Sequence, residues 1–391
     1  MPGDLSQLDD ALEDAGADGY LFDDHDNSDQ YYLSGFDAPD PFVSCYTPAG
    51  IHLLVSGLEY GRAKKEGNAA SVSRLGAYDA RERQAEYGPL EGRARVIAEF
   101  LADHDAEHVL VGQRFPAGTA DGLREQGVSV TVDEDDVVGE VRSVKTDDEI
   151  EHIRAAQEAN QAAMARAEEL LASADIEDGT LVYEDEPLTS ERVKQEIEIE
   201  LLRRNCALDE TIVASGADAA DPHDRGSGPI EAGETIIVDI FPRSKESSYH
   251  GDMTRTFVKG EPSERAREWY DLTHEAYRAA LDAIEPGVTG EDVHDAACDV
   301  YADAGEPTLR DDPETDTGFI HGTGHGIGLD VHEHPRVSVG VDTELEPGHV
   351  VTIEPGLYDP AIGGVRIEDL VVVTEDGYEN LTDYPIEFRL D

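Results

Sequence analysis

The N-terminal part of the chain alternates between short apolar runs and one longer segment in which apolar residues recur at helical spacing. Strands are predicted for residues 18–22 (DGYLF), 50–56 (GIHLLVS), 108–115 (HVLVGQRF) and 128–136 (VSVTVDEDD), and a helix for residues 92–106 (GRARVIAEFLADHDA). Strands that alternate with helices are typical of layered α/β domains. We therefore expect an α/β domain in residues 1–140.

The pattern changes near Glu140, where strand-like runs give way to a long amphipathic stretch beginning TDDEIEHIRAAQEANQ. Acidic residues crowd its first turn, and Asp147 or Asp148 is expected to cap a helix there. Helices should then dominate to about residue 206. We place the second domain at residues 141–391.

The second domain contains an internal sequence repeat. AGETIIVDI and PGHVVTIEP each read as a turn followed by an apolar strand that ends in an acid, Asp239 or Glu354. A second acid, Asp252 or Glu368, opens the next strand in each half. The helices repeat as well: each half contains a segment with the pattern helix, turn, Ser/Thr cap, helix. The pattern predicts a duplicated α+β unit with its active site between the halves.

Acids on neighbouring strands of a hairpin can point to the same face, so the two hairpins could bring four carboxylates into one small volume. In a chain this acidic, an arbitrary Asp or Glu is usually a solvated surface residue. These four, however, lie beside apolar runs, where an unpartnered charge is costly. Two divalent cations and one histidine would complete the site formed by Asp239, Asp252, Glu354 and Glu368.

A segment rich in histidine and glycine, HGTGHGIGLDVHE, covers residues 321–333. It lacks the dinucleotide-binding pattern, because Ile327 and Leu329 stand where that pattern needs glycine. His321 and His325 have the spacing of a zinc-binding helix, but alternating glycines disfavour a helix by about 0.5–1 kcal/mol each. We expect an extended, closely packed segment that presents imidazoles to a metal or a substrate. For a lone histidine a structural role would be the ordinary interpretation, but a cluster of three favours function.

Composition narrows the choice of function. The chain has 391 residues, a formal net charge of −58 and 39% hydrophobic residues, which is enough for two packed domains. No basic face suits nucleic acid, and no apolar run is long enough to cross a membrane. The N-terminus lacks the features of a secretion signal, so a cytoplasmic location is expected. The three cysteines have no metal-ribbon spacing and are expected to be buried thiols.

These motifs resemble one family. HGTGHGIGLDVHE, TIEPGLY, VRIEDLVVV and GDMTRTF together are similar to the pita-bread metallopeptidases, which include Xaa-Pro dipeptidases (prolidases), aminopeptidases P and, more distantly, methionine aminopeptidases. QYYLSGF and VRSVKTDDEIEHIRAA resemble the creatinase-like N-terminal domain of the prolidase and aminopeptidase P branch. The resemblance implies a creatinase-like α/β domain followed by a pita-bread catalytic domain. It also implies a homodimer.

The resemblance implies a role for particular residues. The five metal ligands of the family fall on Asp239, Asp252, His325, Glu354 and Glu368. His223, His321 and His332 match histidines that surround the substrate, and Arg366 matches the arginine of the family. Creatinase-like and histone-chaperone-like members, which share the fold, lack the complete metal-binding set.

The resemblance also implies a mechanism. A hydroxide held between two divalent metals would attack the peptide bond that precedes proline in the second position of a peptide. Glu354 would shuttle the proton to the leaving nitrogen and His332 would stabilise the oxyanion. His223 would contact substrate or assist proton transfer, and Arg366 would orient a ligand carboxylate or pair with substrate. Four oxygen donors and one imidazole suit Mn²⁺ or Co²⁺ at least as well as Zn²⁺.

Two departures from the family pattern bear on specificity. Phe241 stands where the family usually has glycine, and the interval between Asp239 and Asp252 is longer through PRSKESSYH. A longer hairpin turn accommodates the extra residues without moving either ligand. Two alternatives to an Xaa-Pro exopeptidase stay open: a non-catalytic pita-bread module that binds peptides or proteins, and a hydrolase of another amide at the same site.

The charge generates the first prediction. A surface with a net charge of −58 repels itself at ordinary ionic strength, whereas molar salt shortens the screening length to about 3 Å. We expect the protein to be halophilic, so its melting temperature and its activity should both rise between dilute buffer and molar potassium chloride. Thermal unfolding and activity measured across a salt series test this, and equal stability and activity in dilute buffer would contradict it.

Overall fold

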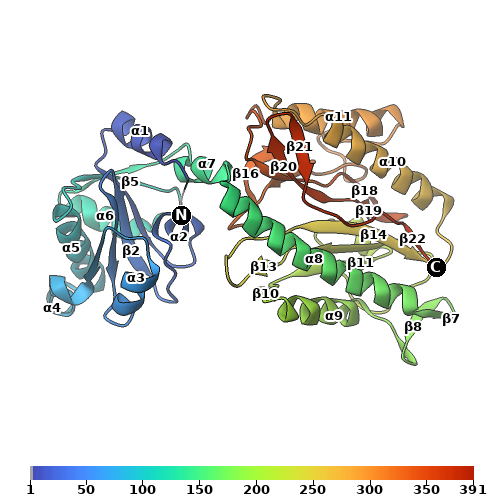
Figure 1. Cartoon of the computed structure of the whole chain (residues 1–391), viewed down its shortest axis with the longest axis horizontal. Coiled ribbons are helices and arrows are strands. Elements are labelled where there is room, and N and C mark those ends of the chain that lie inside the picture. The colour runs from blue at the N-terminus through green and yellow to red at the C-terminus, as the bar shows by residue number, and fades with distance from the viewer. Residues whose placement is uncertain (1–2) are drawn as a thin grey trace. The chain divides into compact units, whose positions relative to one another are not determined.

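The computed structural model describes residues 3–391, and the chain divides into two compact units on either side of the Arg142–Ser143 bond (Figure 1). This division lies close to the domain boundary expected at residue 140. None of the helices among the described residues is long and apolar enough to span a bilayer.

The first unit is built on a mixed six-stranded sheet with the order β4-β3-β2-β1-β5-β6. Its strands are β1 (Gly19–Asp24), β2 (Phe42–Thr47), β3 (Gly50–Val55), β4 (Ser71–Arg74), β5 (His108–Val111) and β6 (Ser129–Val132). Its helices are α1 (Ser6–Ala15), α2 (Ser28–Ser34), α3 (Tyr60–Glu66), η1 (Leu75–Tyr78), α4 (Ala80–Tyr87), α5 (Pro89–Ala102), α6 (Ala117–Glu125) and α7 (Val137–Ser143). The α/β layering expected from the sequence is confirmed.

The second unit contains two larger antiparallel-based sheets. One has the order β11 (Thr211–Ser215), β12 (Ile236–Ile240), β14 (Met253–Lys259), β22 (Arg389–Leu390), and the other β16 (Glu333–Val337), β15 (Gly324–Gly326), β17 (Val350–Ile353), β20 (Asp369–Thr374), β21 (Gly377–Asn380). Smaller sheets are β7 (Asp175–Glu177), β8 (Thr180–Tyr183) and β9 (Glu186–Pro187); β10 (Cys206–Ala207) and β13 (Arg243–Ser244); and β18 (Gly356–Asp359) and β19 (Gly363–Arg366). The helices are α8 (Asp147–Ser173), α9 (Ser190–Arg203), η2 (Asp218–Ala220), α10 (Glu264–Asp282) and α11 (Gly290–Asp303).

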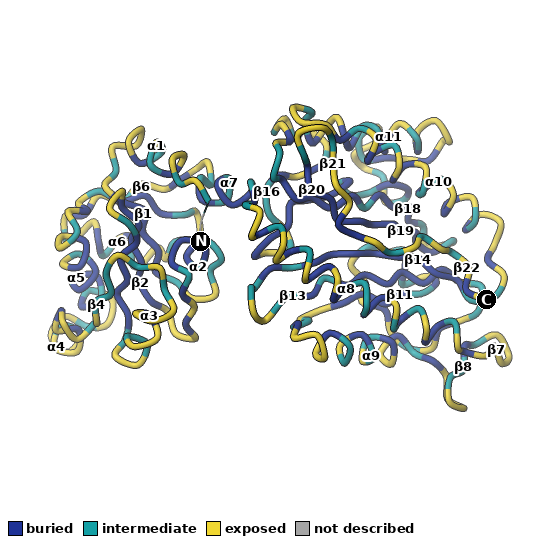
Figure 2. The backbone as a smooth tube through the Cα atoms, viewed as in Figure 1, coloured by how far each residue is buried: buried dark blue, intermediate teal, exposed yellow. Residues whose placement is uncertain are grey.

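The expected duplication is present in the second unit. In one half α8 and α9 pack on the β11–β12–β14 sheet, and in the other α10 and α11 pack on the sheet that holds β17 and β20 (Figure 1). The hairpins correspond: β12 pairs antiparallel with β14, and β17 with β20. Each half has its own apolar core, and the sheet strands are the most deeply buried part of the unit (Figure 2).

The start of α8 differs from the expectation. Asp147 or Asp148 was expected to be the cap, but Thr146 occupies that position and forms a capping box with Glu149. The Thr146 backbone N–H donates to Glu149 Oε2 at 2.8 Å, and the Glu149 N–H donates back to Thr146 Oγ1 at 3.4 Å. The two aspartates lie in the first turn, where their charges favour the positive end of the helix dipole.

The longer interval between Asp239 and Asp252 forms a longer hairpin turn, as expected. β13 pairs with β10, and the Ser244 N–H donates to the Tyr249 carbonyl at 2.9 Å across the turn. The Tyr249 hydroxyl donates to Glu149 Oε1 at 2.6 Å, which fastens the hairpin to α8. The extra residues therefore lengthen the loop and leave β12 and β14 in register.

A fully buried arginine joins the two halves of the unit. Arg255 on β14 is 0% exposed and pairs with Asp369 on β20, Nη2 to Oδ1, at 2.8 Å. Its remaining N–H groups donate to the backbone carbonyls of Thr254, Glu368, Tyr384 and Pro385. Every donor of this side chain is thus used within the protein, which is what makes a buried guanidinium tolerable.

Arg255→Met should lower the free energy of unfolding by about 3–5 kcal/mol, because it leaves Asp369 charged and buried without its cationic partner. Urea unfolding of the second unit in molar salt measures this. Arg203→Met is the matched control, since Arg203 lies on the surface in an exposed i,i+3 pair with Glu200. That change should cost less than about 1 kcal/mol. Equal effects of the two substitutions would contradict the role given to Arg255.

Candidate metal centre

The two hairpins carry the four acids selected from the sequence. Asp239 lies on β12 and Asp252 immediately precedes β14, while Glu354 follows β17 and Glu368 immediately precedes β20. Asp239, Asp252 and Glu368 are buried, and the Glu354 side chain is 18% exposed. The structure therefore brings together carboxylates that are far apart in the sequence, one pair from each half of the duplication.

His325 enters the same space from β15, the central residue of a three-residue strand. Its neighbours are glycines for a steric reason: a Cβ at Gly324 would lie 1.9 Å from the Thr352 carbonyl oxygen, and one at Gly326 would lie 2.0 Å from that of His334. The extended, closely packed segment expected from the sequence is thus present. The glycines allow β15 to fit between β16 and β17.

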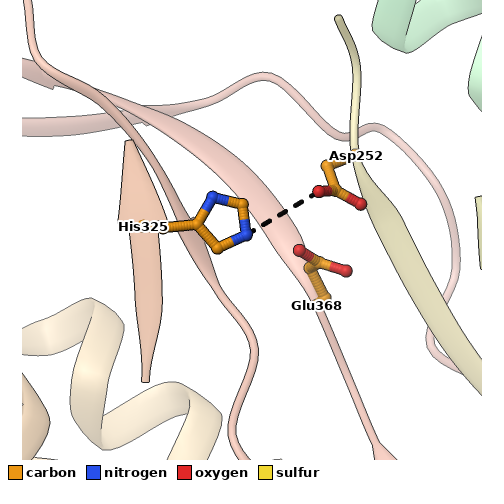
Figure 3. A group of neighbouring side chains, drawn as sticks. All are labelled: Asp252, His325 and Glu368. Carbon is orange, nitrogen blue, oxygen red and sulfur yellow. Dashed lines mark ion pairs between the residues drawn. The ribbon is translucent and has the colours of Figure 1, made fainter. Parts of the chain in front are cut away.

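Three of these side chains converge on one point (Figure 3). Ligand-type atoms of Asp252, His325 and Glu368 all lie within 4.8 Å of one another. His325 Nε2 is 3.8 Å from Asp252 Oδ2 and 3.3 Å from Glu354 Oε1. His325 Nδ1 lies 3.1 Å from the Gly326 carbonyl oxygen, so Nδ1 carries the proton and Nε2 faces the carboxylates with a lone pair.

Burial and mutual repulsion disfavour the charged forms of these carboxylates. Burial raises the pKa of Asp252 and of Glu368 well above the ordinary range, and neighbouring carboxylates raise both further. Burial also raises the pKa of Glu354 to about 7. Burial lowers the pKa of His325 to about 3, which keeps its imidazole neutral. The site therefore has more carboxylates than positive charges to balance them, and it offers a neutral imidazole and carboxylate oxygens as metal donors.

Asp239 is held by Arg366. The guanidinium Nη2 donates to Asp239 Oδ2 at 2.6 Å, and both side chains are largely buried. Asp239 Oδ1 is also buried, and it has no hydrogen-bond partner among residues 3–391. One carboxylate oxygen is therefore neutralised by the arginine, while the other is left for a ligand that the protein itself does not supply.

Tyr358, which was not selected from the sequence, links Arg366 to His321. Arg366 Nη1 donates to the Tyr358 hydroxyl at 2.8 Å, and that hydroxyl lies 2.9 Å from His321 Nε2. His321 Nδ1 lies 2.7 Å from the Gly322 carbonyl oxygen and donates to it, so Nε2 accepts from the phenol. Burial lowers the pKa of His321 to about 3, in keeping with this neutral tautomer. The tyrosine lies in TIEPGLY, but nothing in that motif indicates the contact.

His332 and His223 lie at the exposed side of the site. The His332 ring packs edge-on against His325 at 4.3 Å between centroids. Burial lowers the pKa of His332, and the nearby charges of Arg336 and His223 lower it further. His223 is exposed, and its backbone N–H donates to Asp221 Oδ1 at 3.0 Å. Phe241, directly after β12, is half-buried.

Arg336 is a second residue that was not selected from the sequence. It lies opposite His325 in the pairing of β15 with β16 and is exposed. Its positive charge contributes to the lowered pKa of His325 and His332, after the larger effect of burial. Within the described residues its guanidinium forms no ion pair, although the chain is rich in acids. An exposed, uncommitted cation beside a carboxylate cluster is suited to hold an anionic group of a ligand.

These residues fit divalent cations. The donor set is four carboxylates and one neutral imidazole, which hard or borderline divalent metals prefer. The unpartnered Asp239 Oδ1 and the high pKa values of the buried carboxyls both indicate a site that lacks positive charge. Bound cations would give Asp239 Oδ1 a partner and would lower the pKa values of the buried carboxyls.

Comparison with known proteins agrees with this geometry. Residues 151–375 match the model of "Metallopeptidase family M24", and residues 5–144 match that of "Creatinase/Prolidase N-terminal domain". The chain belongs to metallopeptidase family M24. Its expected fold, a creatinase-like domain followed by a pita-bread catalytic domain, is thereby confirmed.

Relatives within the M24 family share much of the chain. The Xaa-Pro dipeptidase of Pyrococcus horikoshii is 32% identical over 91% of this chain and 90% of its own length. That of Pyrococcus furiosus is 38% identical over 63% of this chain, and the match spans 65% of the relative, just under two thirds of its length. The solved structure of the Xaa-Pro dipeptidase from Bacillus anthracis, 26% identical, superposes with a TM-score of 0.82 over 98% of both chains.

The raised pKa values of the carboxyl groups predict how cation binding depends on pH. Because the folded pKa of Glu354, about 7, exceeds its ordinary 4.5, this group stabilises the metal-free fold fully below pH 4.5 and loses that contribution as pH rises through 7. Asp252 and Glu368 act in the same direction. Divalent cations should therefore bind with proton release, and their affinity should fall as pH falls from 7 towards 5.

Calorimetric titration of metal-free protein with Mn²⁺, in buffers of different ionisation enthalpy, measures the protons released per cation. Asp252→Asn serves as the comparison, because it removes one titrating carboxyl without changing the shape of the side chain. It should weaken cation binding and reduce the number of protons released. Cation binding that is independent of pH between 5 and 8 would contradict the prediction.

Proposed function

We propose that this chain is an Xaa-Pro exopeptidase that depends on two divalent metal ions. One observation carries the proposal: Asp252, His325 and Glu368 converge on one point, with the charges of Asp239 and Glu354 nearby, in a chain that aligns with an Xaa-Pro dipeptidase over 91% of its length. The substrate is a peptide with proline in the second position. The proposed ligands are Asp239, Asp252, His325, Glu354 and Glu368.

When bound, two such cations supply Lewis acidity that activates water and polarises a carbonyl group. Mn²⁺ or Co²⁺ suits the oxygen-rich donor set best, and Zn²⁺ is an alternative. The choice of metal, the homodimer and the cytoplasmic location stay predictions that rest on the sequence and on its resemblance to the family.

The side chains divide the remaining work. Glu354 is the most exposed of the four carboxylates, which suits it to accept a proton from water and pass it to the leaving proline nitrogen. His332 lies at the exposed side of His325, where it can donate a hydrogen bond to the developing oxyanion. His223 and His321 are assigned to substrate contacts. Arg366 holds Asp239 in place by donating to one of its carboxylate oxygens.

Arg336 bears on the length of the substrate. The leaving proline of a dipeptide carries a free carboxylate close to the scissile bond, and an exposed guanidinium can bind it through two parallel hydrogen bonds. In a longer peptide this carboxylate is replaced by an amide, which has no charge. The position of Arg336 opposite His325 therefore favours a dipeptidase over an aminopeptidase P.

A purely binding role, the alternative considered from the sequence, is not favoured. A module that only binds peptides has no need to bury Asp252 and Glu368 next to each other, where neighbouring carboxylates raise the pKa of both. A hydrolase of another amide is distinguished by the substrate test, where Phe241 is the residue to examine if proline is not preferred.

The substrate test compares Ala-Pro, Ala-Pro-Ala, Ala-Pro amide and Ala-Ala in molar salt with Mn²⁺ and with a chelator control. We expect Ala-Pro to be the best substrate and its cleavage to stop with chelator. Arg336→Met should raise KM for Ala-Pro by about 10- to 100-fold, the effect of losing one charge-assisted interaction, and should leave cleavage of Ala-Pro amide almost unchanged.

Arg203→Met, an exposed change on α9, is the matched control and should behave as the unaltered protein. Release of alanine from Ala-Pro-Ala with Ala-Pro spared would mean an aminopeptidase P. No preference for proline would mean a general metallo-exopeptidase. No cleavage of any peptide by protein with bound Mn²⁺ would overturn the proposed function.

A further inference from the structure

A short loop carries His332. It follows β15 and ends where β16 begins, at Glu333. The Gly328 N–H donates to the Asp330 carbonyl at 3.0 Å, and the Asp330 N–H donates to the Glu333 side chain, at Oε1, at 2.9 Å. The Glu333 carboxylate therefore closes the loop on itself, one residue after His332.

The other oxygen of that carboxylate is held by Lys145. Lys145 Nζ lies 2.9 Å from Glu333 Oε2, and the two side chains are 1% and 5% exposed. Lys145 and Glu333 are far apart in the sequence, because the lysine lies just before α8 and the glutamate in the second half of the duplication. Such a pair, shielded from water, is screened little by salt.

The lysine is itself fixed. Its backbone N–H donates to the Gly348 carbonyl at 2.9 Å, and Nζ lies 3.3 Å from the Ser143 carbonyl. The preceding residue, Val144, forms a β-bridge with His349, and His349 Nε2 lies 3.2 Å from Ser143 Oγ. These contacts hold the Lys145 ammonium group next to the turn that precedes β17, the strand leading to Glu354.

A buried ion pair of this kind constrains position more than it adds stability. If the loop moved, this ion pair would be broken while both side chains were still shielded from water, so displaced conformations are strongly disfavoured. The residue beside Glu333 is His332, whose ring packs on His325. The ion pair of Lys145 and Glu333 therefore restricts the distance between His332 and the carboxylate cluster.

We propose that Lys145 and Glu333 are positioning residues that fix His332 over the reaction centre. The proposal rests on the proposed function, because it assigns to His332 the contact with the oxyanion. Lys145 and Glu333 do not touch the substrate themselves. They act through the His332 loop, and a displacement of about 1 Å in such a group can lower turnover by about 100-fold.

The test uses Lys145→Met, which keeps the length of the side chain and removes its charge, and Glu333→Gln, which keeps an acceptor for the Asp330 N–H. Each should lower kcat for Ala-Pro by about 100-fold, with KM and the number of bound Mn²⁺ ions little changed. The double variant should lose no more than either single variant, because the two residues act as one unit. Lys145→Arg, which keeps the charge, should restore most of the turnover.

A second readout needs no substrate. The ring of His332 is followed by NMR of protein labelled at histidine Cε1, without metal, with His332→Asn to assign the signal. Its resonance should shift or broaden in Lys145→Met and in Glu333→Gln. Lys245→Met, an exposed lysine of the β13 hairpin, should leave it unchanged. If Lys145→Met does not fold, the His332 resonance and the kcat of Glu333→Gln test the proposal.

An unchanged His332 resonance in these variants, with kcat retained and only the melting temperature lowered, would overturn the proposal and leave the pair a purely structural one. The failure of the proposed function has a different signature. There the unaltered protein cleaves no Xaa-Pro peptide, and the resonance alone decides whether the ion pair positions His332.

Discussion

Four carboxylates buried in one small volume repel one another, and the architecture of the second unit follows from the need to hold them there. The duplicated hairpins deliver two acids each, and rigid strands fix their positions. A buried arginine, Arg366, balances part of the charge by pairing with Asp239. The remaining repulsion would be relieved by bound cations.

Close approach of backbones is the second requirement. His325 can reach the cluster only because β15 fits between two strands whose carbonyl oxygens leave no space for a Cβ at Gly324 or Gly326. The same segment continues into the loop that carries His332. Steric constraints thus place the His325 imidazole among the carboxylates and the His332 imidazole at the exposed side of the site. The buried pair of Lys145 and Glu333 holds the loop that carries His332.

The sequence predicts the parts of this arrangement that have a local signature. Apolar strands ending in an acid indicated both hairpins, and alternating glycines indicated an extended β15. Local patterns also mislead: Asp147 and Asp148 are good caps in isolation, but Thr146 has the glutamate three residues later that completes a capping box. Tyr358, Arg336 and the Lys145–Glu333 pair had no signature, because each acts through a neighbour that only the fold brings near.

The electrostatics of this protein therefore operate in two environments that respond differently to salt. Repulsion across an exposed surface with a net charge of −58 acts through water, and molar salt shortens its range to about 3 Å. The pairs Arg366–Asp239, Arg255–Asp369 and Lys145–Glu333 are shielded from solvent and are screened far less. Salt can consequently relieve the repulsion that opposes folding without weakening the ion pairs that align the site.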